Sequence, residues 1–116
     1  MFRKKTEMEH ETAENCHGGS GKFEMYNVLK SEDGDVGILF MHEDFLEPGT
    51  IFAEHLHADC EEIYYVVEGK CTMIMDGKQY SMETGDVSLV NIGHTHGIIN
   101  SGSSISRLLV VGVAKK

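Results

Sequence analysis

The sequence lacks most of what a helical or disulfide-bonded protein requires. It has no tryptophan, and a single proline stands against thirteen glycines, a balance that favours tight turns over long helices. No helical periodicity of any length appears after residue 23. The three cysteines are an odd number and form no Cys-x-x-Cys pair, which fits a reducing compartment and argues against structural disulfides.

Basic residues are scarce as well. Lys and Arg number 10 against 19 Asp and Glu, so the net charge is −9. An acidic chain argues against nucleic acid and anionic membranes as partners, because both attract clustered Lys and Arg. No apolar run is long enough to cross a membrane, and none follows the basic residues at the N-terminus as it would in a secretory signal. We therefore expect a cytoplasmic protein.

What is present divides the chain into two parts. Residues 1–22 are polar, contain four basic and four acidic residues, and end in a glycine-rich run. This composition predicts a flexible tail, in which His10, Cys16 and His17 are either solvated residues or additional metal ligands. Residues 23–116 then form one domain, because 116 residues leave room for only one.

The second part has the pattern of many short strands separated by turns. His42 continues one face of an apolar strand, either at its rim or lining a cavity, and residues 43–49 are predicted to form a loop. Strands are predicted at 23–29, 36–41, 50–57, 61–68, 70–75, 79–82, 87–90, 96–100 and 107–113. Short strands at this spacing predict an all-β sandwich or barrel.

A His-x-His pair ends one of these strands. Residues i and i+2 of a strand share a face, so His55 and His57 lie beside each other at the end of an apolar face. Imidazole suits zinc, copper, iron and nickel, and a nearby carboxylate extends the choice to harder metals. Glu61 and Glu62 follow within a few residues, and His96 is a third candidate nitrogen ligand.

The spacing of these residues is similar to that of the cupin superfamily. The first cupin motif, G-x5-H-x-H-x3,4-E-x6-G, is met by Gly49, His55, His57, Glu62 and Gly69. The second, G-x5-P-x-G-x2-H-x3-N, is met by Gly85, Asn91, Gly93, His96 and Asn100. Asn91 stands where the family has proline, a change that concerns a turn and not a ligand.

The resemblance implies the double-stranded β-helix, or jelly-roll barrel, of the cupins. It also implies that His55, His57, Glu62 and His96 converge on one divalent transition metal ion, Fe, Mn, Ni, Co or Zn. Three nitrogens and one oxygen leave two positions of an octahedron open, and open positions separate a catalytic metal site from a closed structural one. Glu61 is the alternative carboxylate, and we choose Glu62 because its spacing to the glycine that ends the motif then matches as well.

Several neighbouring residues are candidates for second roles. His94 is either a general acid or base or a plain loop histidine. Tyr64 shares a face with Glu62 and either donates a hydrogen bond to a ligand or packs with its hydroxyl satisfied. Cys60 is either a thiol beside the metal or an ordinary loop residue, and Asn100 is expected to hold a turn.

Resemblance to cupins does not select a reaction, because one fold hosts many functions. We expect a metal-dependent enzyme of dioxygenase or isomerase and epimerase type, acting on a small oxygen-rich metabolite, because so short a chain encloses only a small cavity. The alternative is a binding or sensor protein that holds a metabolite through the metal without converting it.

The apolar strands also predict self-association. Residues 23–29, 36–41 and 108–113 are apolar at both alternating positions, and a strand of that kind must be covered on both faces. No amphipathic helix in the sequence can supply the second cover. Small cupins usually pair through outer sheet faces, so we expect a homodimer.

Overall fold

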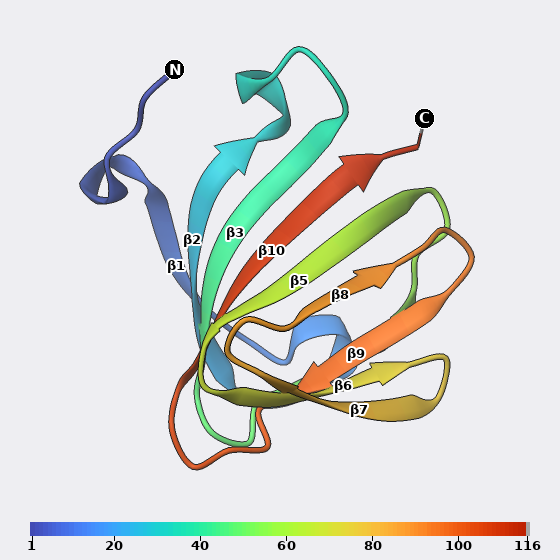
Figure 1. Ribbon diagram of the computed structural model, residues 1–116. Helices are drawn as coiled ribbons and strands as arrows, with labels where there is room; N and C mark the ends of the chain where they lie inside the picture. Colours follow the sequence, from blue (N-terminus) through green and yellow to red (C-terminus); the bar gives the residue numbers. More distant parts are fainter. Residues whose placement is uncertain (116) are drawn as a thin grey trace.

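The computed structural model describes residues 1–115, which form ten strands, three short 3-10 helices and no α-helix (Figure 1). One sheet contains six strands, in the order β1 (Glu9–Glu14), β2 (Lys22–Lys30), β3 (Ile38–Leu46), β10 (Ser106–Ala114), β5 (Cys60–Glu68) and β8 (Val87–Val90). The other contains four, in the order β4 (Ile51–Leu56), β9 (Thr95–Ile99), β6 (Lys70–Met75) and β7 (Lys78–Glu83). The 3-10 helices are η1 (Lys5–Glu7), η2 (Cys16–Gly18) and η3 (Ser31–Asp33). None of the helices in the described range is long and apolar enough to span a membrane.

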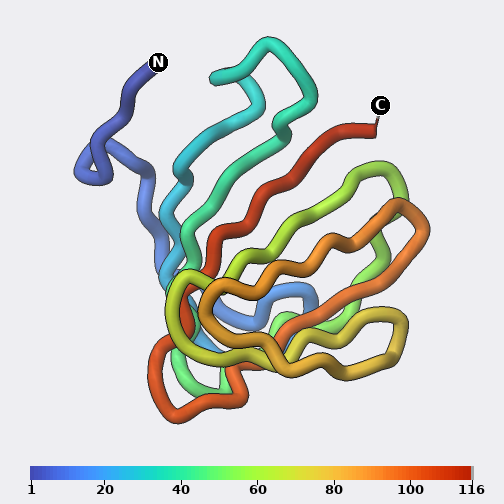
Figure 2. The backbone as a smooth tube through the Cα atoms, viewed as in Figure 1, coloured from blue at the N-terminus to red at the C-terminus, as the bar shows by residue number. Residues whose placement is uncertain are grey.

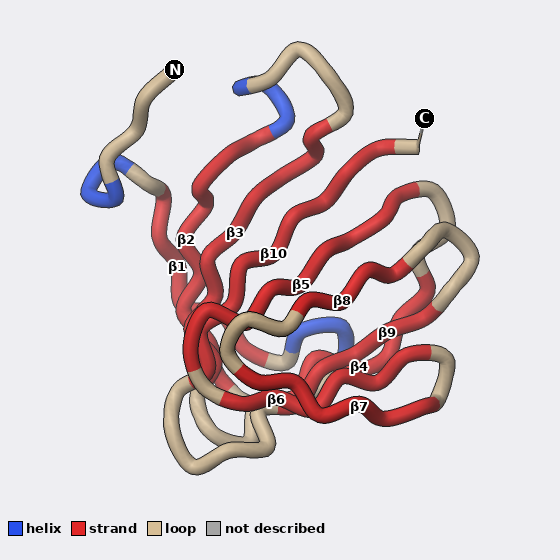
Figure 3. The backbone as a smooth tube through the Cα atoms, viewed as in Figure 1, coloured by secondary structure: helices blue, strands red, loops and turns tan. Residues whose placement is uncertain are grey.

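The two sheets face each other as the layers of a jelly roll (Figure 3). From β3 onward the chain crosses repeatedly between them, with β3, β5, β8 and β10 in one layer and β4, β6, β7 and β9 in the other. The predicted all-β jelly-roll fold is therefore confirmed. Within residues 1–115 no strand pairing joins the two sheets into a continuous cylinder, so the barrel is open along its sides.

Alternation along the strands builds the core between the layers. On β5, Tyr64 and Val66 are 3% and 0% exposed, whereas Tyr65 between them is 41% exposed. Inward side chains from both sheets then pack as one apolar cluster, which includes Phe23, Leu46, Phe52, Met73, Met82, Ile98 and Leu108. Hydrophobic burial of this cluster holds the two layers together.

Strand β3 extends further than the sequence predicts. The predicted loop over residues 43–49 is wrong for its first four residues, which belong to β3. Glu43 lies on the outer face of the sheet, where its charge is compensated by the side chains of Arg107 and Lys5. This pairing makes a charged residue compatible with a strand in the middle of the sheet. The extension turns the next residue, Asp44, into the interior, where it is 3% exposed.

The segment predicted to be a flexible tail, residues 1–22, is instead built into the fold. Strand β1 pairs along its whole length with β2 and forms one edge of the six-stranded sheet. Its side chains are mostly exposed, so its place depends on backbone pairing rather than on apolar burial. Residues 15–21, which we call the clasp, follow β1 and meet the start of β4 through a Ser20–Ile51 bridge (Figure 2).

Glycine lets the clasp lie close against β4. A Cβ atom at Gly19 would stand only 1.9 Å from the carbonyl oxygen of Ile51. Asn15 and His17 adopt left-handed backbone, with φ of 57° and 53°, which is uncommon for residues with side chains. This close approach brings Cys16 and His17 to the space between the two sheets.

The outer face of the six-stranded sheet is apolar at its centre. Strand register aligns one row of side chains across β3, β10, β5 and β8, namely Met41, Val111, Ile63 and Leu89. The adjacent row contains Leu109, Tyr65 and Val87. Tyr65, Val87 and Leu89 are 41%, 63% and 44% exposed, so this face remains open to solvent in the single chain.

Candidate metal centre

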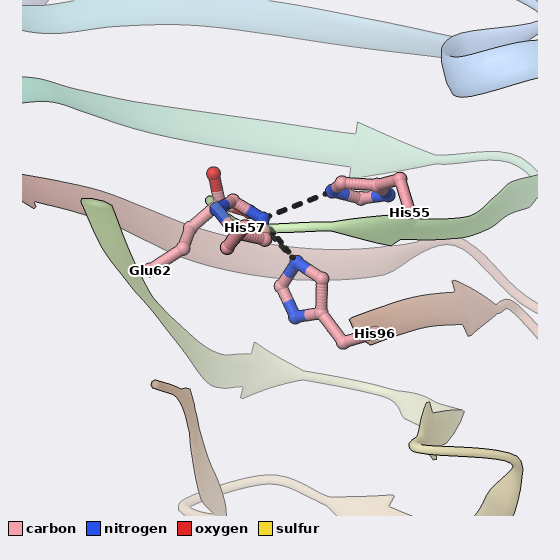
Figure 4. Close-up of side chains that lie close together, drawn as sticks. All are labelled: His55, His57, Glu62 and His96. Atoms are coloured by element: carbon pink, nitrogen blue, oxygen red, sulfur yellow. Dashed lines mark hydrogen bonds and ion pairs between the residues drawn. The ribbon is translucent and has the colours of Figure 1, made fainter. Parts of the chain in front are cut away.

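Three histidines and one glutamate converge between the two sheets (Figure 4). His55 on β4 and His96 on β9 are paired directly in the strand register. His57 follows the end of β4, and Glu62 reaches across from β5 in the facing sheet. The four ligating atoms all lie within 4.8 Å of one another.

Backbone hydrogen bonds hold His57 in place. Its N–H donates to the carbonyl of His94 at 3.0 Å, and the N–H of Gly93 donates to the His57 carbonyl at 2.7 Å. Gly93 has a φ of 87°, a left-handed conformation that glycine adopts without strain. The two motifs are therefore tied to each other at the site itself.

The distances within the cluster fit a single metal ion. Nε2 of His57 lies 3.1 Å from Nε2 of His55 and 3.0 Å from Nε2 of His96. Nε2 of His96 lies 3.2 Å from Oε1 of Glu62. Two ligand atoms that are each about 2.1 Å from one ion, and at right angles to each other, are about 3.0 Å apart. The residues thus fit the transition metal that the donor set of imidazole and carboxylate implies.

The second ring nitrogen, Nδ1, has different surroundings in the three histidines, and in His55 its contact indicates the tautomer. Nδ1 of His55 donates to the carbonyl of Ala53 at 2.9 Å, and Nδ1 of His57 lies 3.4 Å from Sγ of Cys60. A proton on Nδ1 leaves the lone pair of Nε2 free to face the centre. Nδ1 of His96 is buried and has no partner among residues 1–115.

The protonation states also suit a cation. Burial lowers the pKa of His57 and so favours neutral imidazole. Burial alone would raise the pKa of Glu62, but hydrogen bonding and charge from His96 and His57 hold it below its ordinary value. Neutral imidazole and ionised carboxylate are the forms that bind metal.

A cavity of about 260 Å³ adjoins Glu62. A space of this size has room for a small metabolite. Three phenylalanines, a methionine and a valine form its apolar lining. Its polar lining consists of Cys16, His17, His42, Asp44, Glu62 and Tyr64.

The structure brings the four predicted ligands together and distinguishes Glu62 from Glu61. Glu61 lies on the opposite face of β5, where it accepts a hydrogen bond from the side chain of Asn91. Asn91 is the residue that replaces the proline of the second motif. Alternation along β5 therefore turns only Glu62 toward the histidines.

Of the two residues predicted for catalytic roles, Tyr64 lies at the cavity and His94 does not. Tyr64 lines the cavity, and burial together with the charge of Glu62 raises its pKa well above the ordinary value, so its hydroxyl remains a hydrogen-bond donor. His94 is exposed, and its Nδ1 pairs with Asp76 at 2.7 Å, away from the cavity. His94 precedes the first residue of β9, so the strand alternation that directs His96 inward does not extend to it.

Asn100, the last residue of the second motif, holds a turn as expected. Its side-chain N–H groups donate to the carbonyls of Leu46 and Ser104, both at 2.9 Å. Its side-chain oxygen accepts from the N–H of Gly102 at 3.0 Å. It therefore supports the loop before β10 and does not line the cavity.

Sequence reasoning missed Asp44 as a cavity residue and placed His42 there only as one of two alternatives. Both side chains belong to the inner face of β3, beside Phe40. The assigned loop over residues 43–49 concealed Asp44. The signal that could have revealed it is the alternation of Phe40, His42 and Asp44, which continues to Leu46.

The clasp contributes residues that no strand pattern predicts. The ring of His17 stacks on that of the ligand His55, with centroids 3.6 Å apart and planes inclined by 13°. Cys16 packs against the core, and burial, followed by the charges of Asp44 and Glu62, raises its pKa to about 11. It is therefore a neutral thiol at neutral pH.

Comparison with known proteins gives a consistent picture. A family model described as a cupin domain matches residues 43–112. A protein of Thermotoga maritima named oxalate-binding protein is 30% identical over 111 residues, covering 96% of this chain and 92% of that protein. A crystal structure described as a predicted oxalate decarboxylase from Thermotoga maritima is 29% identical, with a TM-score of 0.93, and the match covers 99% of this chain and 100% of that chain. A sugar phosphate isomerase of the cupin superfamily from Silicibacter pomeroyi is 23% identical, with a TM-score of 0.69, over 80% of this chain and 60% of that chain; this likeness shows the fold alone.

Replacing a ligand should release the metal. We expect His55→Ala, His96→Ala and Glu62→Gln each to lower metal affinity by more than the roughly 10–100-fold that loss of an outer hydrogen-bond partner costs. Glu61→Gln, which changes the outward neighbour, should keep full occupancy. Metal content per chain after purification measures the effect, and full occupancy in both histidine variants would contradict the assignment.

The thiol of Cys60 should help to orient His57. We expect Cys60→Ala to weaken metal binding about 10-fold, because Nδ1 of His57 loses its acceptor, and Cys60→Ser to restore most of the affinity. Competition with a chromogenic chelator measures affinity, and the absorption spectrum of the Co(II)-loaded protein reports ligand geometry. Cys71→Ala, in the core, is the control. Wild-type affinity and an unchanged spectrum in Cys60→Ala would show that the contact has no such role.

Proposed function

The chain belongs to the cupin family, and from that premise we propose that it is a metal-dependent enzyme acting on a small oxygen-rich metabolite. The proposal is supported chiefly by the adjacency of the His55, His57, Glu62 and His96 cluster to a cavity of about 260 Å³. Around an octahedral ion, four protein ligands leave two positions open for a substrate, whereas four ligands close the tetrahedral shell of a structural zinc site. A bound Fe, Mn, Ni, Co or Zn ion would supply Lewis-acid chemistry or, if redox-active, oxidative chemistry.

The cavity walls provide the groups that bind and orient such a substrate. The protonated hydroxyl of Tyr64 can donate a hydrogen bond beside Glu62. Burial lowers the pKa values of His17 and His42, so both rings are neutral near pH 7 and can either donate or accept. The phenylalanines between these groups make the rest of the lining apolar. A mainly apolar pocket with a few convergent polar groups is typical of small-molecule sites.

Short carboxylic acids of the oxalate class are the first substrates that we propose. The Thermotoga maritima protein named oxalate-binding protein and the Thermotoga maritima crystal structure described as a predicted oxalate decarboxylase both match nearly the whole chain. Such acids fit the cavity and carry oxygen atoms that can meet the cluster. Oxidative or carbon–carbon bond-cleaving reactions suit them, whereas an isomerase or epimerase reaction would need a hydroxylated aldehyde or ketone.

The second candidate function is binding without turnover. The name of the Thermotoga maritima oxalate-binding protein, which is 30% identical to this chain, supports it. A protein of this kind would use the same ligands and the same cavity. The two functions therefore differ only in whether the bound metabolite is converted.

We also propose that two copies pair through the outer face of the six-stranded sheet. The rows centred on Val111 and Leu109 form a continuous apolar surface. Glu43 interrupts the second row but is already paired with Arg107 and Lys5, so two copies can meet without burying an uncompensated charge. A surface of one chemical type is self-complementary, as two-fold association requires.

A cytoplasmic location completes the proposal. Cys16, Cys60 and Cys71 are all free thiols. Free thiols persist in reducing compartments, whereas secreted proteins usually pair them.

Turnover should be detectable in the metal-loaded protein. Protein loaded in turn with Fe(II) and Mn(II) is incubated with oxalate, glyoxylate, glycolate and a panel of aldoses and ketoses, while oxygen uptake, carbon dioxide release and sugar interconversion are followed. We expect conversion of at least one short acid, and its loss in Glu62→Gln, since that change removes a metal ligand. Calorimetric binding without conversion would favour the second candidate, and absence of both would contradict the proposed function.

The proposed dimer should depend on the outer apolar rows. Sedimentation equilibrium at micromolar concentration is expected to give twice the chain mass of 12.9 kDa for the wild type. Val111→Glu should give a single-chain mass, because a charge would face its own copy across the two-fold axis. Ile105→Glu, an exposed apolar residue before β10, is the matched control and should remain dimeric. A wild-type mass of one chain that does not change on concentration would contradict the dimer.

A further inference from the structure

Asp44 is a carboxyl group sealed inside the protein. It lies on the inner face of β3, is 3% exposed, and its Oδ1 has no hydrogen-bond partner among residues 1–115. Its neighbours in the strand register are Met25 on β2 and Leu108 on β10. An apolar side chain would serve the core better at this position, because burying a polar group without a partner is costly. An unpaired buried carboxyl therefore calls for a partner that the chain itself does not supply.

No cation of the chain compensates Asp44. The titratable groups around it are His42 and Glu43 of β3, Cys16 and His17 of the clasp, and Glu62 and Tyr64 of β5. Burial, followed by the negative charges of Glu62 and Glu43, raises the pKa of Asp44 to about 7. The two histidines are neutral because burial lowers their pKa values. Near neutral pH, Asp44 therefore readily holds a proton.

Asp44 and Glu62 occupy diagonal corners of the cavity. Strand β10 lies between β3 and β5, so these two strands are about 10 Å apart, twice the spacing of neighbouring strands. Asp44 shares its row with Leu108, whereas Glu62 shares its row with Gly112, and the row of Val110 lies between them. All three rows contribute to the cavity lining. A ligand that meets the metal cluster beside Glu62 can extend across the cavity toward Asp44.

We propose that Asp44 is the second ligand-binding group of this site: its carboxyl group hydrogen-bonds the end of a short anionic ligand that lies away from the metal cluster, and the two share one proton. This inference rests on the proposed function, because it assumes a small acid held at the metal. A carboxylate next to an anionic end would repel it, so ligand binding takes a proton from solvent. Asp44 thereby selects acids with two oxygen-bearing ends over acids with one.

Calorimetric titration of the full-length, Mn(II)-loaded protein tests the inference. Oxalate and malonate are the two-ended probes and acetate is the one-ended probe, each titrated from about pH 6.5 to about pH 8.5 in two buffers of different ionisation enthalpy. We expect the wild type to take up about one proton per dicarboxylate bound at about pH 8.5, where Asp44 is ionised before binding, and much less at about pH 6.5, where Asp44 is already protonated. Affinity should fall about tenfold per pH unit above about pH 7. Acetate should show neither effect.

Two variants separate the hydrogen bond from the proton. Asp44→Asn keeps a donor that does not titrate, so proton uptake should disappear and the pH dependence should flatten while dicarboxylate binding persists. Asp44→Leu removes the donor and should weaken dicarboxylate binding at least about tenfold at pH 7, with acetate binding unchanged. Asp35→Asn, an exposed aspartate between β2 and β3, is the matched control. Metal content is measured in every sample and should not differ.

Stability at high pH distinguishes this role from a structural one. The pKa of the Asp44 carboxyl is about 7 in the folded protein and 3.8 at its ordinary value. Between pH 3.8 and about pH 7 the folded state therefore binds a proton on Asp44 that the unfolded state does not. The free energy of unfolding falls as pH rises through this range. At pH 8 the full cost of burying the ionised carboxyl is present in the wild type, so both variants should melt no lower than the wild type.

The possible results are distinct. Wild-type affinity and pH dependence in Asp44→Leu would overturn the inference and leave the proposed function standing. If Asp44→Leu does not fold, Asp44→Asn decides, because an unchanged pH profile and unchanged proton uptake in that variant would also overturn it. If the fully loaded wild type binds none of the three probes, the proposed function fails and this inference fails with it.

Discussion

The convergence of four metal-ligating atoms on one point is the condition that the rest of the structure must satisfy. Nε2 of His57 lies 3.1 Å from that of His55 and 3.0 Å from that of His96, Glu62 lies beside them, and one cation can bind all four groups at once. The ligands come from both layers, because β4 and β9 supply the histidines while β5 supplies Glu62. A metal ion would therefore link the two sheets in addition to the apolar core. Metal binding would couple to the stability of the open barrel for this reason.

Much of this centre could be predicted from the sequence because it depends on strand alternation. His55 and His57 share parity, and the parity of Glu62 and Tyr64 sends both side chains into the interior, where the structure finds them. The spacing between the two motifs could not by itself place His96 beside His55. That contact depends on the pairing of β4 with β9, which the resemblance to cupins supplied.

The parts that could not be predicted depend on contacts between distant residues. Glu43 resembles a loop residue until Lys5 and Arg107, 38 and 64 positions away, are seen to pair with it on the outer face. The clasp is likewise polar and rich in glycine, as a flexible linker is, yet Gly19 is needed for close approach to Ile51. In both cases local composition suggested a loop, whereas tertiary contacts selected an ordered conformation.

Two carboxyl groups give the small cavity two chemically different ends. Glu62 and Asp44 are both buried, but a hydrogen bond and charge from His96, followed by charge from His57, hold the pKa of Glu62 low, whereas no such partner offsets the burial of Asp44. When the environments of two carboxyl groups make their pKa values differ, the two groups can take different chemical roles. The end at Glu62 carries a fixed negative charge that suits a metal ion, and the end at Asp44 carries a proton that it can share. An anionic ligand between them would find a cation at one end and a hydrogen-bond donor at the other, so the cavity would orient such a ligand.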